Sequence, residues 1–231
     1  MHLELPKGRL HSLKDFSKHY LMIVLSILTA LGLEAWIERS HHTHAAEVAS
    51  QQIEAEIRTN LTETHAALEH DAEQLKRLSK IRDSLIEDFK ARVPEDTIKR
   101  HILEQAKDRF DLGLRFPSLR HEAWDVGVAN QAVSWIDHER VQRYSAAYAN
   151  QRDSAAAMTE NISILMTGTG LVDTVADLQT DEAQPREFLH VISQMIAMQR
   201  QMVNNLGLLE KQLAAALPNG SPDTAKPAQA S

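Results

Sequence analysis

Histidine is the residue type that gives this sequence its best chance of chemistry, since twelve histidines occur among 231 residues and cysteine is absent. His41, His42 and His44 stand together, and imidazole is a good ligand for Zn²⁺ and Cu²⁺. On a helix His41 and His44 share one face, but His65 lies about 36 Å beyond His41. A metal site here would therefore need ligands from a second subunit. The competing interpretation is a solvated cluster near lipid headgroups that gains charge as the pH falls.

A second motif, Glu187-x-x-His190, is one half of the di-iron signature of helical bundles. That signature needs a second E-x-x-H and two further glutamates on facing helices. The other E-x-x-H of the sequence, Glu38 to His41, lies directly after the longest uncharged segment and far from Glu187 in the sequence. Glu63, His65 and Glu69 also fall close together, but such clusters are typical of a solvated helix face. We therefore expect no di-metal centre and no cofactor.

Other catalytic patterns are missing from the sequence. It contains no G-x-S-x-G, no H-E-x-x-H and no cysteine nucleophile. The glycines of segment 167–170 lack the lysine of a phosphate-binding loop. Met195, Met198 and Met202 recur at helical spacing, which favours a packed core over a cofactor site. We expect a protein that is not an enzyme.

The longest uncharged segment is YLMIVLSILTALGL, residues 20–33, and it predicts a membrane anchor. A helix from Tyr20 to Trp36 covers about 24 Å, near the spacing of the two aromatic belts of a bilayer. The apolar side chains expected in the membrane are Leu21, Ile23, Leu25, Ile27, Leu28 and Leu31. Two alternatives stay open: a signal peptide cleaved near Ala30-Leu31-Gly32, and the buried core helix of a soluble protein.

Basic residues are concentrated before the anchor. Arg39 is the one Lys or Arg in the next 20 residues or so, and the residues before the segment are Lys7, Arg9, Lys14 and Lys18. This bias predicts a cytoplasmic N-terminus and an exported body. The whole chain has a net charge of −7 and its negative charge lies outside the basic head, so we expect no nucleic-acid partner.

The rest of the chain predicts an all-α fold. Between Leu33 and Val93 there is no Gly and no Pro, which favours one very long helix continuous with the anchor. Its second half carries an apolar stripe: Ile53, Ile57, Leu61, Leu68, Leu75, Leu78, Leu85 and Phe89. Further helices are predicted over about 96–111, from Pro117 to about 137, over 138–166 and over 185–217, with a weak short helix after residue 170.

The helix lengths favour an antiparallel bundle packed against the distal half of the long helix. The expected domains are a basic cytoplasmic head (1–19), an anchor (20–37), a helical stalk (38–56), a bundle (57–217) and a disordered tail (218–231). The poorly covered stalk points to a homo-oligomer, which stays open because the stalk lacks a clean heptad.

Four segments carry a resemblance to a known group of proteins. They are the anchor, IEAEIRTNL from Ile53, the segment around Trp124 and Gly127, and the stretch from Tyr144 to Tyr148. Over about residues 15–215 the chain resembles an uncharacterised family of bacterial proteins with one N-terminal span and an exported helical domain. The resemblance implies a fold and a location, the periplasmic side of the bacterial inner membrane, but no catalytic residues.

These observations predict a membrane-anchored helical bundle that acts as a scaffold or interaction module. Its expected partners are the lipid bilayer and proteins of the cell envelope. One alternative is a ligand-sensing bundle, in which a small molecule binds between helices. The other is a metal-binding protein that uses His41, His42 and His44.

Overall fold

The computed structural model describes residues 13–106, 113–167 and 170–218. These ranges contain α-helices and one 3₁₀ turn and no strand, so the predicted all-α class is confirmed. The elements are α1 (Leu13–Lys90), α2 (Glu95–Ala106), α3 (Glu122–Ala129), the 3₁₀ turn η1 (Ala132–Trp135), α4 (His138–Thr167), α5 (Gly170–Gln179) and α6 (Pro185–Ala216).

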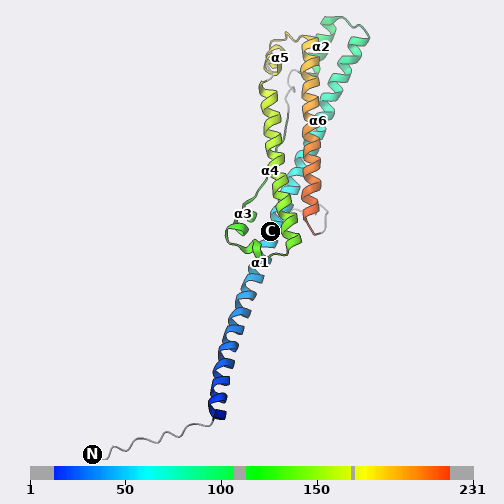
Figure 1. Cartoon of the computed structure of the whole chain (residues 1–231). Coiled ribbons are helices and arrows are strands. Elements are labelled where there is room, and N and C mark those ends of the chain that lie inside the picture. Colours follow the sequence, from blue (N-terminus) through cyan, green and yellow to red (C-terminus); the bar gives the residue numbers. More distant parts are fainter. Residues whose placement is uncertain (1–12, 107–112, 168–169, 219–231) are drawn as a thin grey trace, which may run out of the picture.

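Helix α1 is a rod of 78 residues, about 115 Å long. Its first part stands alone and its second part is enclosed by the other helices (Figure 1). Near the N-terminus it has a stretch long and apolar enough to cross a membrane, and none of that stretch is buried. The helix ends at Lys90, close to Arg92 with a positive φ of 56° and to Pro94, as the sequence predicted.

Three long helices form the bundle: the second part of α1, α4 and α6 (Figure 1). The base of the bundle, at the end nearer the free part of α1, joins Ile53 and Ile57 of α1 to Leu209 and Leu213 of α6. At the far end, Leu78 of α1 packs in one cluster with the first half of α6. Helices α1 and α6 are therefore antiparallel, whereas α4 begins at the base and runs parallel to α1.

The apolar stripe predicted on α6 is the core of the molecule. Its side chains are almost fully buried, and they are Phe188, Ile192, Met195, Met202, Leu206, Leu209 and Leu213. Of the three methionines predicted to pack in the core, Met195 and Met202 are fully buried and Met198 is half-buried. Pro185 begins α6, where a missing backbone N–H costs no helical hydrogen bond.

Packing on α1 starts earlier than predicted. Residues 38–56 were expected to form an uncovered stalk, yet Ala46 and Ala49 are buried and Ile53 is fully buried. These small side chains permit a close approach, because Gly127 of α3 lies against Ala49 and Ile53. The free part of α1 therefore ends near Ala46 rather than at residue 56.

Segment 113–121 has no regular secondary structure, which corrects a second prediction: a helix was expected to begin at Pro117, whereas α3 begins at Glu122. The segment follows α1 because buried polar side chains of α1 bond to its backbone. Asp71 Oδ1 accepts a hydrogen bond from the backbone N–H of Arg115 at 2.9 Å, and Asn60 bonds to both the N–H and the C=O of Arg120. We call residues 113–121 the strap. The predicted end of the preceding helix near residue 111 lies outside the described residues.

Candidate functional site

The predicted anchor residues all lie on the uncovered part of α1. Tyr20 and Trp36 are 63% and 67% exposed, and the same holds for the apolar side chains between them: Leu21, Ile23, Leu25, Ile27, Leu28 and Leu31. Of the basic residues that predict the topology, Lys18 is exposed. Lys7 and Arg9 lie outside the described residues, and the side chain of Lys14 is not described.

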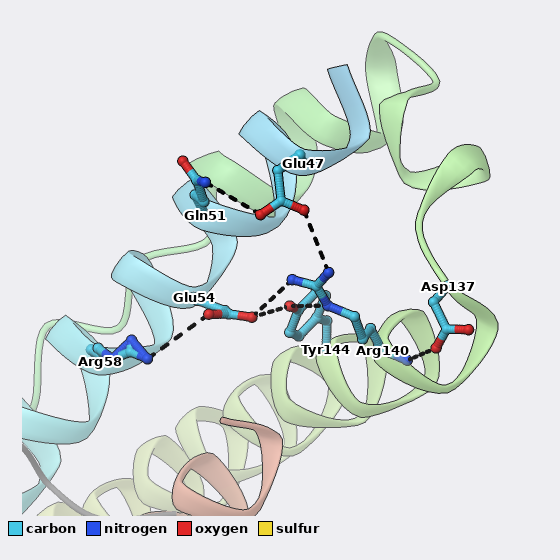
Figure 2. A network of polar contacts seen from close by, with 7 residues as sticks. All are labelled: Glu47, Gln51, Glu54, Arg58, Asp137, Arg140 and Tyr144. Carbon is cyan, nitrogen blue, oxygen red and sulfur yellow. Dashed lines mark hydrogen bonds and ion pairs between the residues drawn. The ribbon is translucent and has the colours of Figure 1, made fainter. Parts of the chain in front are cut away.

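A polar network joins α1 to α4 at the base of the bundle (Figure 2). The Glu54 carboxylate accepts hydrogen bonds from Tyr144 Oη at 2.6 Å and from Arg140 Nη2 at 3.1 Å. Arg140 also approaches Glu47 at 3.7 Å. Asp137 Oδ1 accepts the first backbone N–H groups of α4, which fixes where that helix begins. One guanidinium group thus links two turns of α1 to the start of α4.

A second carboxylate two residues further along α1 makes a matching set of contacts. Glu56 Oε1 accepts a hydrogen bond from Tyr148 Oη at 2.6 Å, and Glu56 Oε2 accepts one from the backbone N–H of Ala123 at 2.9 Å. Burial and the hydrogen bond to Glu56 raise the pKa of Tyr148, and burial raises the pKa of Tyr144. Both phenols therefore stay protonated and act as donors that tie α4 to α1.

Three segments that the sequence singled out separately meet at this place. Glu54 and Glu56 belong to the segment IEAEIRTNL, and Tyr144 and Tyr148 belong to the α4 segment. Trp124 of the third segment stacks on Tyr148, with ring centroids 5.4 Å apart. The sequence predicted these segments as packing patterns, and the pairing of their polar groups was missed. Residues two apart on a helix do not face each other, so the spacing of Glu54 and Glu56 gave no signal of this pairing.

The three neighbouring histidines face different surroundings. The ring of His42 stacks on Trp135 of η1, with centroids 4.0 Å apart, and it lies 3.7 Å from Glu38. His41 and His44 are exposed. Within the described part of the chain, no three His, Asp or Glu side chains gather as metal ligands. A metal shared with a second subunit stays an untested prediction.

The other acidic and histidine clusters serve as contacts between segments. Glu187 and His190 are exposed on α6, so the lone E-x-x-H does not face the bundle core. His65 Nδ1 lies 2.6 Å from Glu210 of α6, and His65 Nε2 lies 3.4 Å from Glu69. The hydrogen bond to Glu210 raises the pKa of His65, which favours an ion pair between α1 and α6.

Two buried polar residues of α1 were not predicted to matter. Asn60 is fully buried and holds the strap. Asp71 is fully buried too, and burial raises the pKa of its carboxyl group. Its Oδ2 has no hydrogen-bond partner among the described residues. Polar residues on the buried face of a predicted helix are the signal that could have located the strap.

Comparisons of this chain with protein-family models, with curated proteins and with solved structures find no match.

Proposed function

We propose that this chain is a single-span protein of the bacterial inner membrane whose periplasmic bundle is a non-enzymatic scaffold or interaction module. One observation supports this most directly. Helix α1 leaves its whole apolar stretch uncovered and then, without a break, supplies the central stripe of the bundle core. An exposed apolar surface of this size needs a partner, and its length suits a bilayer.

The base of the bundle is close to the expected membrane surface. Trp135 stacks on His42, which is about 9 Å along α1 from Trp36. With Trp36 at the level of the headgroups, as its aromatic ring favours, little free helix separates the bilayer from the bundle. Such an arrangement would hold the bundle close to the membrane surface.

The charge bias gives the orientation. Lys7, Arg9, Lys14 and Lys18 precede the apolar stretch, and a cluster of basic residues stays on the cytoplasmic side. The bundle then lies on the periplasmic side, where partners of the cell envelope can reach it.

Exposed apolar side chains of the bundle are the places to look for a partner. Leu208 of α6 is 57% exposed and Val172 of α5 is 63% exposed. A photo-crosslinking amino acid placed at either position in living cells should give a defined heavier adduct. The matched control is Gln201, an exposed polar position on α6. Adducts at none of the three positions would argue against an interaction module, and an adduct of twice the chain mass would identify a homo-oligomer.

A further inference from the structure

A groove of about 290 Å³ opens beside the polar network, between the strap, α3 and α4. Its lining is mixed. Leu119 and the rings of Trp124 and Tyr148 supply apolar surface, and Arg120, Arg152 and Gln151 supply polar groups. A volume near 300 Å³ is at the small end of sites for small molecules.

The rings of Trp124 and Tyr148 form the aromatic wall of this groove, and contacts with α1 hold them in place. Tyr148 donates a hydrogen bond to Glu56 on α1 and stacks on Trp124 with an interplanar angle of 27°. The backbone N–H of Ala123, next to Trp124, bonds to the same carboxylate. The wall is therefore preorganised, which lowers the entropy cost of binding a ligand against it.

On the polar side of the groove, the backbone of Arg120 is held by hydrogen bonds, whereas the side chains of Arg120 and Arg152 are exposed. Asn60 holds both backbone groups of Arg120, and Gln151 Nε2 donates to the same carbonyl oxygen at 3.3 Å. The side chains of Arg120 and Arg152 are exposed and have no ion-pair partner among the described residues. The buried Gln151 Oε1 has no donor there either.

The other two charged side chains that line the groove pair with each other and not with these guanidinium groups. His121 Nδ1 lies 2.7 Å from Asp125 Oδ2, so the one acidic residue of the rim is already paired. The hydrogen bond to Asp125 raises the pKa of His121, which favours the protonated ring. Two guanidinium groups without an ion-pair partner among the described residues therefore border the groove next to the aromatic wall, while Glu56 lies behind that wall and Glu122 lies beside His121.

We propose that this groove binds a small organic carboxylate with a flat apolar body. A guanidinium group presents paired donors that match a carboxylate, and a flat body can lie against the Trp124 and Tyr148 wall. Glu56 and Asn60, which hold the groove, lie about 30–36 Å along α1 from Trp36. The ligand therefore comes from solution, because headgroups of the same bilayer do not reach this height.

Calorimetric titration of the full chain in lipid nanodiscs tests the proposal, with benzoate as the probe. Acetate supplies the charge without the flat body, and benzyl alcohol supplies the body without the charge. Benzoate should bind saturably and more tightly than either. Replacing Arg120 and Arg152 together by Gln should weaken benzoate binding roughly tenfold or more, because charge-assisted hydrogen bonds are lost. Arg200→Gln, at an exposed position on α6, is the matched control and should bind like the parent chain.

A second variant keeps the test valid if the double substitution disturbs folding. Ala155 is exposed and lines the groove, so Ala155→Trp should fill it and abolish benzoate binding while the circular dichroism spectrum is unchanged. Absence of saturable benzoate binding by the parent chain would overturn the proposal. Equal binding by the parent chain, the Arg120/Arg152 variant and Ala155→Trp would overturn it too. Neither result bears on the membrane anchor or on protein partners.

Discussion

The two halves of α1 differ in where their apolar side chains lie and in what covers them. From Tyr20 to Trp36 its apolar side chains point outward all around and touch no other part of the described chain. From Ala46 onward most of the large apolar side chains keep to one stripe, and that stripe is buried mainly by α6, with η1, α3 and α2 covering the rest. The backbone is the same unbroken helix throughout.

The two halves differ both in the number of their apolar side chains and in the arrangement of those side chains. An apolar surface all around a helix suits a lipid environment, whereas a stripe with polar neighbours suits a bundle in water. Hydroxyl side chains bond to carbonyl groups of their own helix in both halves, and in the second half other polar side chains also bond to another segment. In the first half Ser26 and Thr29 donate to the carbonyl groups of Met22 and Leu25 in their own helix. In the second half Asn60 and Asp71 bond to another segment.

The largest expected effect comes from placing charge in the first half. Ile27→Arg combined with Leu28→Arg should shift the protein from the membrane fraction to the soluble fraction. Each Arg near the centre of a span costs about 2.5–3.5 kcal/mol of insertion free energy. Fractionation after alkaline carbonate extraction checks this. Leu208→Arg combined with Val172→Arg is the control, because both side chains are exposed on the bundle. Retention of the Ile27/Leu28 variant in the membrane would contradict the assignment of the anchor.

A matched pair of isoleucines compares the two halves directly. Ile57 is fully buried and Ile27 is 53% exposed, both on α1. Ile57→Ala should lower the free energy of unfolding of the bundle by about 2–5 kcal/mol, because it leaves a cavity in the core. Ile27→Ala should leave that free energy unchanged. Urea titration of the detergent-solubilised protein, followed by circular dichroism, measures both. Equal losses from the two substitutions would mean that the halves are not distinct.

The next effect concerns the strap. Asn60→Ala removes both hydrogen bonds to Arg120 and leaves its backbone N–H without a partner, while its C=O keeps the hydrogen bond from Gln151. An unpaired buried polar group costs roughly 1–3 kcal/mol. We expect the free energy of unfolding to fall by that order and hydrogen exchange at Arg120 to speed up. Asn205→Ala, on the surface-facing side of α6, provides the comparison. Unchanged exchange at Arg120 would show that Asn60 does not hold the strap.

The smallest effect depends on pH. Burial raises the pKa of Asp71 in the folded protein above its unfolded value, so its contribution to stability is fully present below the unfolded pKa and is lost as the pH rises through the folded pKa. Asp71→Asn keeps an acceptor for the Arg115 N–H and cannot ionise. At pH 7 we therefore expect the variant to be more stable by roughly 1 kcal/mol.

Urea midpoints between pH 4 and pH 7 measure this difference. The gain of Asp71→Asn over the parent chain should shrink as the pH falls towards 4. A gain that is independent of pH, or a loss at pH 7, would show that ionisation of Asp71 is not what limits stability.

Most of the fold could be predicted from the positions of proline and glycine and from the spacing of apolar residues. Pro94, Pro185 and the glycines around residue 170 bound the helices, and the stripe on α6 is the core that its spacing indicated. The strap could not be predicted, because its course depends on side chains of α1 that are distant in the sequence. The start of the packed region was misplaced for a related reason. Ala46 and Ala49 are too small to indicate a core by themselves, and their burial depends on a close approach by α3.

The candidate site was predicted in its parts but not in its assembly. The segments around Glu54, Trp124 and Tyr144 were each singled out, yet their meeting depends on the parallel course of α4 beside α1. That course follows from the strap, which returns the chain to the base. Because the strap was wrongly predicted, the direction of α4 could not be predicted, and neither could the pairing of the two glutamates with the two tyrosines.

The most direct test of the central claim is residue-specific labelling in intact cells. Single cysteines at Ser12, in the basic head, and at Ser145, an exposed position on α4, are treated with a membrane-impermeant thiol reagent, and the cells are then fractionated. We expect the membrane fraction to hold the protein, with Ser145→Cys labelled in intact cells and Ser12→Cys labelled after lysis. Labelling of Ser145→Cys after lysis alone, or recovery of the protein in the soluble fraction, would contradict an exported bundle on a membrane anchor.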